Sequence, residues 1–281
     1  MKLSFSTLPC EGWSVEQLIE SCKKYGFTGI ELKEDARYVV TIDSTEEELR
    51  RAAEKFRKAG IIVTNIGTRV IFNGVESNGA ERLAELKRNI ELAQALDAKG
   101  VRVMLGNYLR FKDAGEQPIK RQQIVRYLRE GCDYASERGV EVWIETHNEF
   151  STGQVLRQLL NEIDRDNCHI IYDIIHPFEF GEAPEETVRL FGRNCAHIHM
   201  KDGVPFEDPR IHEWKYTLIG EGALPLRSIV ETLEANGYDG YYSLEWEPKW
   251  RPELQQLNLD VNDVLASYSS IMKSMIEVQE S

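Results

Sequence analysis

Four side chains of metal-binding type stand at the ends of four strand-like segments in the second half of the chain. They are Glu145 in VEVWIETH, Asp173 in HIIYDIIH, His199 in AHIHMKD and Glu245 in YYSLEW. Each segment is rich in β-branched and aromatic residues and runs into polar loop and then helix-like sequence. In a parallel barrel, such strand ends converge on one face. Three carboxylates and one imidazole predict a site for one divalent ion. This ligand set favours Mn²⁺, Mg²⁺ or Co²⁺, also accepts Zn²⁺, and includes no thiolate.

The neighbours of these acids strengthen the prediction of a shared cation. A single acid at a strand end is commonly a helix N-cap or a solvated loop residue. Here the acids lie within WIETH, IYDII and SLEWE, beside bulky apolar residues. An unpaired carboxylate is costly to bury in such surroundings, so each needs a cation or hydrogen-bond donors. Four such positions on four successive strands favour one shared ion.

Strand-like and helix-like stretches alternate with a period of about 30 to 40 residues, the rhythm of βα units. Eight strands are predicted, at 3–7, 29–34, 61–68, 100–106, 140–147, 168–176, 195–202 and 240–246. Helical spacing of apolar residues predicts helices at 15–26, 45–60, 79–96 and 117–138, one running to Asn161 and a terminal helix at 259–277. Ser44 or Thr45, and Ser151 or Thr152, are suitable N-caps. Eight units in 281 residues predict an α/β fold, a single (β/α)8 TIM barrel over 1–281 with a C-terminal helix.

Composition narrows the class of protein. The net charge of -13, from 34 Lys and Arg against 47 Asp and Glu, disfavours nucleic-acid partners but suits a divalent cation. Five cysteines without a C-x-x-C pair predict reduced, buried thiols. No signal-like or membrane-spanning apolar segment is found, so we expect a cytoplasmic protein without a membrane partner.

One segment interrupts the rhythm. Residues 203–224 read as a long loop with Gly and Pro after the seventh strand, and long loops in compact domains are usually functional. This loop is a candidate lid or substrate wall. Substrate specificity is expected from residues 203–220 of this loop and from the segments 34–43, 68–79 and 107–116.

Several motifs give the chain a resemblance over nearly its whole length. They are ETHNEF (145–150), YDIIHP (172–177), HIHMKDG (197–203), LIGEGALPL (218–226) and GYDGYYSLEWEP (237–248). The chain resembles the xylose isomerase-like TIM-barrel superfamily of sugar phosphate isomerases and epimerases, which includes tagatose 3-epimerase-like, inosose dehydratase, dehydroshikimate dehydratase and endonuclease IV enzymes. The resemblance implies that Glu145, Asp173, His199 and Glu245 are the metal ligands. It also implies that Glu145 and Glu245 are the catalytic acid/base pair, moving a proton through an enediolate. Homodimers or homotetramers are common in that family.

Further residues are candidates for substrate binding. The resemblance assigns His176, three residues after Asp173, to contacts with substrate oxygens. Lys201 shares a strand face with His199 and either binds substrate or pairs with an acid. His147 and Glu221 complete the set; Glu221 lies in a Gly-Glu-Gly turn that is equally compatible with a surface role.

The chain departs from the family pattern at one position, because it lacks an arginine that the sugar epimerases of the family use. Sugar epimerases of the family carry an arginine shortly after the strand-seven histidine, whereas this chain has Gly203-Val204-Pro205, leaving Arg210 or Lys215 as substitutes.

The leading hypothesis is a metal-dependent isomerase or epimerase of a sugar, sugar phosphate or related polyhydroxy carbonyl compound. The alternative is a metal-dependent dehydratase acting on an inosose or dehydroshikimate. Endonuclease IV-like repair and a non-catalytic sugar-binding barrel rank below both, the former because every histidine lies at or beyond position 147.

Overall fold

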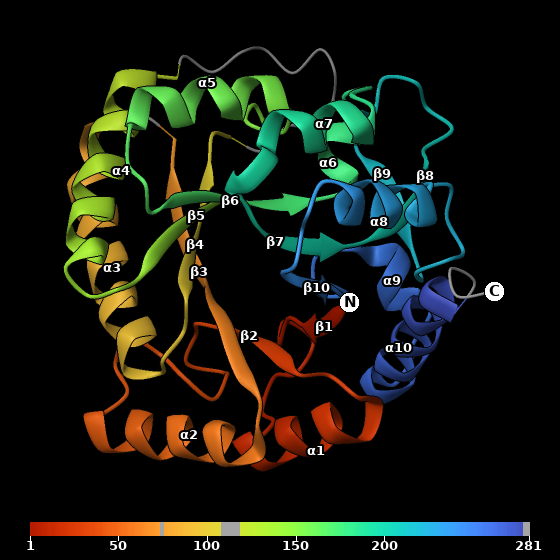
Figure 1. Ribbon diagram of the computed structural model, residues 1–281, viewed down its shortest axis with the longest axis horizontal. Coiled ribbons are helices and arrows are strands. Elements are labelled where there is room, and N and C mark those ends of the chain that lie inside the picture. The colour runs from red at the N-terminus through yellow and green to blue at the C-terminus, as the bar shows by residue number, and fades with distance from the viewer. Residues whose placement is uncertain (74–75, 108–118, 278–281) are drawn as a thin grey trace.

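A computed structural model describes residues 1–73, 76–107 and 119–277, and its central feature is a parallel barrel (Figure 1). Eight strands form one sheet in the order β1-β10-β7-β6-β5-β4-β3-β2. Their bounds are β1 Lys2–Phe5, β2 Gly29–Lys33, β3 Ile62–Phe72, β4 Gly100–Leu105, β5 Glu141–Glu145, β6 Cys168–Asp173, β7 Cys195–Met200 and β10 Tyr241–Leu244. The two edges meet where the Thr7 amide donates to the Glu31 carbonyl at 2.9 Å. The predicted (β/α)8 TIM barrel is confirmed.

Helices follow the strands around the outside of the barrel. Their bounds are α1 Val15–Tyr25, α2 Glu46–Ala59, α3 Glu76–Ala95, α4 Arg121–Ser136, α5 Gly153–Ile163, α6 Ile175–Glu179, α7 Pro184–Phe191, α8 Leu226–Ala235, α9 Pro252–Gln256 and α10 Val261–Glu277, with a short 3₁₀ helix at Gly192–Asn194. The side chain of Thr45 caps α2 within a capping box, and that of Thr152 caps α5, so the predicted N-caps are confirmed. The predicted start of the fourth helix at 117 and most of the segment 107–116 lie outside the described residues.

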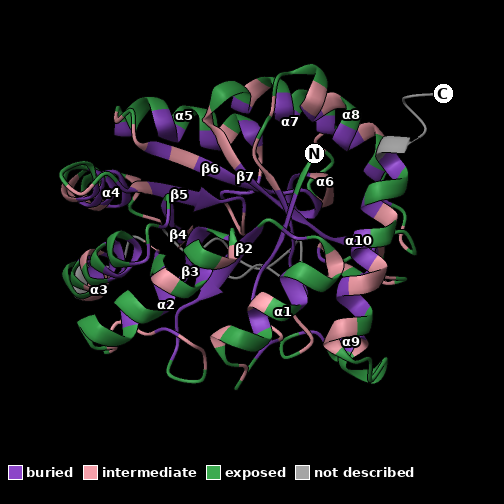
Figure 2. Cartoon of the chain, turned by 60° about the horizontal axis from the view of Figure 1, so that its bottom comes forward, coloured by how far each residue is buried: buried purple, intermediate pink, exposed green. Residues whose placement is uncertain are grey.

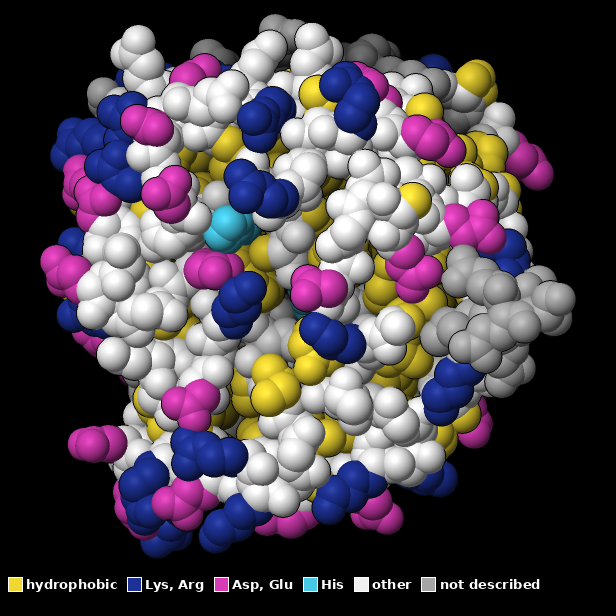
Figure 3. Space-filling model, viewed as in Figure 1, with side chains coloured by type: hydrophobic (Ala, Val, Ile, Leu, Met, Phe, Trp, Pro, Cys, Tyr) yellow, Lys and Arg dark blue, Asp and Glu magenta, His cyan; other side chains and the backbone are white. Residues whose placement is uncertain are grey.

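Burial follows the layers of the fold. In Figure 2 the strands are almost entirely buried, and the helices are buried on the side toward them and exposed on the other. The C-terminal helix α10 covers the barrel where β1 and β10 meet, since the Tyr268 hydroxyl donates to the Tyr242 carbonyl at 2.9 Å and the ring stacks on Phe27. On the face seen in Figure 3, acidic and basic side chains are interspersed. No helix in the described ranges is long and apolar enough to cross a membrane.

The segment after β7 corrects a prediction. Instead of an irregular loop over 203–224, β8 (Asp202–Pro205) and β9 (Trp214–Thr217) pair as an antiparallel hairpin. The Asp202 carboxylate then accepts hydrogen bonds from the backbone amides of Gly220 and Gly222 at 2.9 and 3.0 Å. A Cβ at position 222 would lie 2.1 Å from Asp202 Oδ1, so only glycine permits this approach. The prediction was wrong because Gly and Pro in the segment were taken as signals of irregular structure, whereas Gly203 and Pro205 lie within the short paired strand β8.

Candidate metal centre

The structure brings the four predicted ligands together inside one end of the barrel. Glu145 and Asp173 are the last residues of β5 and β6, His199 is next to last in β7, and Glu245 directly follows β10. One ligand atom from each lies within 4.8 Å of all the others, and all four side chains are buried. They meet because parallel strands of a barrel end on the same face. Their role as ligands stays a prediction.

Three carboxylate oxygens of this cluster accept no hydrogen bond from the described residues, and this arrangement fits a cation. Glu145 Oε2, Asp173 Oδ2 and Glu245 Oε2 are buried and have no hydrogen-bond partner within the described part of the chain. Arg102 and Lys201 contact them as ion pairs at 2.8 to 3.1 Å, without hydrogen-bond geometry. A buried carboxylate oxygen normally has a donor or a cation. The three oxygens, with the Nδ1 atom of His199, form an oxygen-rich set that fits one divalent ion.

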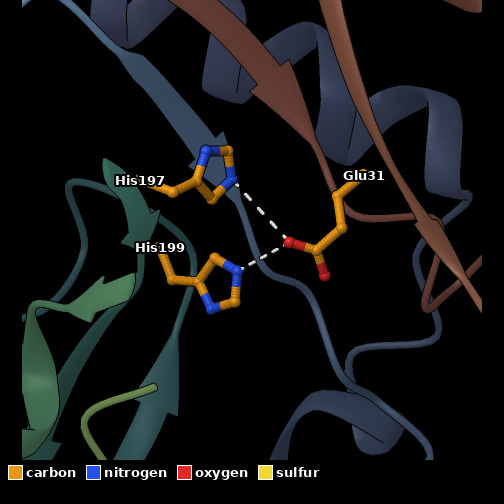
Figure 4. Close-up of side chains that lie close together, drawn as sticks. All are labelled: Glu31, His197 and His199. Carbon is orange, nitrogen blue, oxygen red and sulfur yellow. Dashed lines mark hydrogen bonds and ion pairs between the residues drawn. The ribbon is translucent and has the colours of Figure 1, made fainter. Parts of the chain in front are cut away.

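Glu31 on β2 orients the imidazole of the cluster (Figure 4). Its Oε2 atom lies 2.8 Å from His199 Nε2, while His199 Nδ1 lies 2.9 Å from Glu145 Oε1 and 3.2 Å from Glu245 Oε2. A carboxylate on one ring nitrogen fixes the tautomer and directs the other nitrogen toward a metal. The burial of His199 alone would lower its pKa, but the carboxylates of Glu245 and Glu31 raise it well above the usual value. The ring thus sits between an orienting acid and the ligand cluster.

Glu31, His197 and His199 also form a compact group that could hold an ion, as Figure 4 shows. The oxygens of Glu31 are, however, already approached by Ser6 Oγ at 3.0 Å, by Asn65 Nδ2 at 2.9 Å and by His199. Burial, reinforced by His199, lowers the pKa of His197 to about 3, so this ring is neutral and brings no charge. The donors around Glu31 favour an orienting role for this group over a second ion.

Substituting Glu31 with glutamine is therefore expected to weaken metal binding on the order of 10-fold or more. The amide is a weaker acceptor for the Nε2–H of His199 than the carboxylate is, so the ring is held and polarised less. Competition between the protein and a chelating dye for Mn²⁺ would measure the change. Ser6→Ala, which removes only the hydrogen bond to Oε1, should have a smaller effect. Equal affinities of Glu31→Gln and the unaltered protein would exclude the orienting role.

Arg102 in β4 was not predicted. Its Nη1 atom lies 3.1 Å from Glu145 Oε2 and 3.2 Å from Glu245 Oε1, and the side chain is buried. The guanidinium thus bridges the two glutamates of the predicted acid/base pair. An arginine between Val101 and Val103, in an otherwise apolar strand, was the available signal in the sequence.

Lys201, His147 and His176 surround the cluster. Lys201 Nζ lies 2.8 Å from both Asp173 Oδ2 and Glu245 Oε2 and 2.6 Å from Glu247 Oε1. The rings of His147 and His176 pack edge to face with centroids 4.6 Å apart, and burial lowers the pKa of His147 to about 4. Both histidines line a small hollow with Asn148, Ser151, Glu179, Phe180, His212 and Glu213. These three predicted substrate residues are thus placed around the cluster.

The remaining predicted residues lie elsewhere. Glu221 is exposed in its turn, and no hydrogen bond or ion pair in the described ranges joins its side chain to the cluster. Of the two cations considered as substitutes for the family arginine, Arg210 is exposed and paired with Asp208, and Lys215 is exposed. The buried arginine that does contact the cluster is Arg102.

The chain belongs to the xylose isomerase-like TIM barrel family, whose model matches residues 19–262. An inosose isomerase of Bacillus velezensis is 25% identical over 278 residues, and the match covers 92% of this chain and 92% of that relative. A 3-dehydroshikimate dehydratase of Bacillus anthracis is 22% identical, with 83% of this chain and 85% of the relative covered. A crystal structure of IOLI protein with a binding zinc atom has the same fold, with a TM-score of 0.79, 22% identity and 98% of both chains covered. The predicted family is confirmed.

Proposed function

We propose that this protein is a divalent-metal-dependent isomerase or epimerase of a sugar or related polyhydroxy carbonyl compound. The observation that carries the proposal is the buried cluster, in which two glutamates contact the same nitrogen of one imidazole and share a site with Asp173. The inosose isomerase relative supports an enzyme that rearranges a polyhydroxylated ketone. Family membership supports the same reaction class, although one fold hosts many activities.

Proton movement in this proposal is assigned to the two glutamates. When bound, a divalent ion polarises the substrate carbonyl and makes the neighbouring C–H more acidic. Glu145 and Glu245 approach the cluster from β5 and β10, which are separated in the sheet by β6 and β7. One carboxylate removes the proton and the other returns it. Lys201 and His176, which both contact Asp173, orient the substrate hydroxyls and carbonyl.

A dehydratase is the second candidate, and the position of Lys201 favours it. Its ammonium group lies 2.8 Å from both Asp173 and Glu245, where it can donate a proton to a departing hydroxyl. The carboxylates of Asp173, Glu245 and Glu247 raise the pKa of Lys201 well above its usual value against the opposing effect of burial, and this raised pKa keeps the ammonium protonated but makes it a weaker acid. The 3-dehydroshikimate dehydratase relative supports this alternative. The two reactions share proton removal and differ only in the next step.

An assay in D₂O separates the candidates. The Mn²⁺-loaded protein is incubated with ketoses, with an inosose and with 3-dehydroshikimate, and the products are followed by NMR and absorbance. We expect epimeric or isomeric products with deuterium on carbon; a new enone or aromatic absorbance would identify the dehydratase instead. Absence of both reactions with every substrate would contradict the proposal.

Metal removal is expected to abolish that activity. Dialysis against a strong chelator removes the ion to which the ligand set is suited, and adding back Mn²⁺ or Co²⁺ should restore turnover. Metal content is measured before and after dialysis. Full activity in a preparation verified to be metal-free would exclude the metal-dependent reaction.

A further inference from the structure

Lys33 is a buried lysine without a carboxylate partner. It is the last residue of β2 and is only 5% exposed. Its ammonium group approaches the backbone carbonyls of Gly67 at 3.2 Å and Thr68 at 3.4 Å, and no acid within the described ranges forms an ion pair with it. Lys201, the other buried lysine of the barrel, contacts three carboxylates. Burial and the charge of Arg102 lower the pKa of Lys33 to about 7, against the opposing effect of Glu34 and Glu31, neither of which forms an ion pair with it.

Lys33 lies beside the candidate metal centre. It follows Glu31 by two residues, so both side chains leave β2 on the same face, with Lys33 nearer the end of the barrel where the ligands meet. The carbonyl oxygen of Thr68 accepts from Lys33 Nζ and, at 3.0 Å, from Arg102 Nη2. Two cations therefore meet at one oxygen. The other end of the same guanidinium contacts Glu145, so the pair borders the ligand cluster.

Unused donors remain at this pair of cations. Arg102 Nε is buried and has no hydrogen-bond partner among the described residues. An ammonium group has three N–H donors, and Lys33 has two acceptors among the described residues, both neutral carbonyls. Buried cations are usually matched by a negative charge, and arginine and lysine together are suited to carboxylate and phosphate. A neutral sugar offers only hydroxyl groups and would leave the charge of Lys33 unmatched.

We propose that Lys33 and Arg102 form an anion-binding subsite beside the metal centre, so that the substrate carries a carboxylate or phosphate group in addition to its carbonyl. The assignment of this anion to the substrate rests on the proposed function. The subsite selects acidic polyols or sugar phosphates over neutral sugars because only an anion matches the charge of Lys33. Lys33 contacts the anionic group directly, and Arg102 links that group to the glutamates of the cluster.

Calorimetric titration of the Mn²⁺-loaded protein with inorganic phosphate, D-glycerate and glycerol tests the subsite. We expect phosphate or glycerate to bind and glycerol not to bind at the same concentration. Lys33→Met should weaken anion binding at least about 10-fold, as expected for loss of a charge-assisted hydrogen bond. Lys33→Arg, which keeps the charge, should retain most of it, and Lys58→Met on the exposed face of α2 should change nothing. Binding of phosphate alone indicates a phosphorylated substrate, and binding of glycerate alone indicates an acid.

Two results would overturn the subsite: no anion binding by the unaltered protein, or equal binding by Lys33→Met. Methionine is similar in length and removes a buried charge, so this variant is expected to fold, which circular dichroism and its Mn²⁺ affinity verify. Titration of Mn²⁺ alone tests the metal centre separately. If Mn²⁺ does not bind, the proposed function fails and titration of anions into the metal-free protein still decides the subsite. If Mn²⁺ binds and the anions do not, only the subsite fails.

Discussion

Glutamine at position 145 or 245 is expected to lower kcat by about 10²–10⁴-fold or more, while the barrel stays folded. Each substitution keeps the size of the side chain but removes a group that can take and return a proton. Glu145 and Glu245 both contact His199 Nδ1 and Arg102 in the buried cluster, so they act as a unit. The double variant should therefore be little worse than either single variant. Steady-state kinetics at saturating Mn²⁺, with metal content measured for each variant, would test this.

Two comparisons separate proton transfer from metal binding. Asp173→Asn removes a predicted ligand that is not part of the acid/base pair, so excess Mn²⁺ should restore part of its activity. Excess metal should not rescue either glutamine variant. Glu130→Gln, on the exposed surface of α4, should behave like the unaltered protein. Near-normal kcat in Glu145→Gln or Glu245→Gln would exclude the paired-glutamate mechanism.

Substitution of Arg102 with methionine is expected to destabilise the metal-free protein by about 3–5 kcal/mol. The guanidinium is buried and contacts both Glu145 and Glu245, so its loss leaves two buried carboxylates without that cation. A bound divalent ion would supply positive charge at the same two carboxylates. The stability deficit should therefore shrink when Mn²⁺ is added, beyond the ordinary stabilisation by a bound ligand. Urea denaturation in chelator and in Mn²⁺ would measure both values.

A surface arginine provides the matched control for this prediction. Arg126 pairs with Glu130 at 3.0 Å on α4, with most of its side chain exposed. Arg126→Met should change stability by about 0–1 kcal/mol, with or without Mn²⁺, because exposed ion pairs contribute little. If Arg102→Met in chelator were as stable as Arg126→Met, the cation would not be compensating the two glutamates.

Local sequence was sufficient to predict the architecture and the ligand cluster. The alternation of strand and helix patterns is a local property, and counting it gave the barrel. The proximity of Glu145, Asp173, His199 and Glu245 could be predicted because each ends a strand-like run, and the ends of parallel strands meet. The predicted boundaries were less accurate. The strand predicted at 61–68 extends to Phe72, and the strand predicted at 168–176 stops at Asp173, shortly before α6 begins. Pairing between strands sets those limits, and a single segment does not contain that information.

The surroundings of the cluster depended on the tertiary structure. Glu31 meets His199 across 168 positions of sequence, and Arg102 meets Glu245 across 143. These contacts exist because the sheet closes, with β2 brought beside β1 and through it to β10. Likewise, Lys33 approaches Arg102 only because β2, β3 and β4 pair in register through Gly67. The sequence by itself determined which residue types end the strands. Closure of the barrel decided that Glu31, Lys33 and Arg102, from β2 and β4, lie beside those strand-end residues.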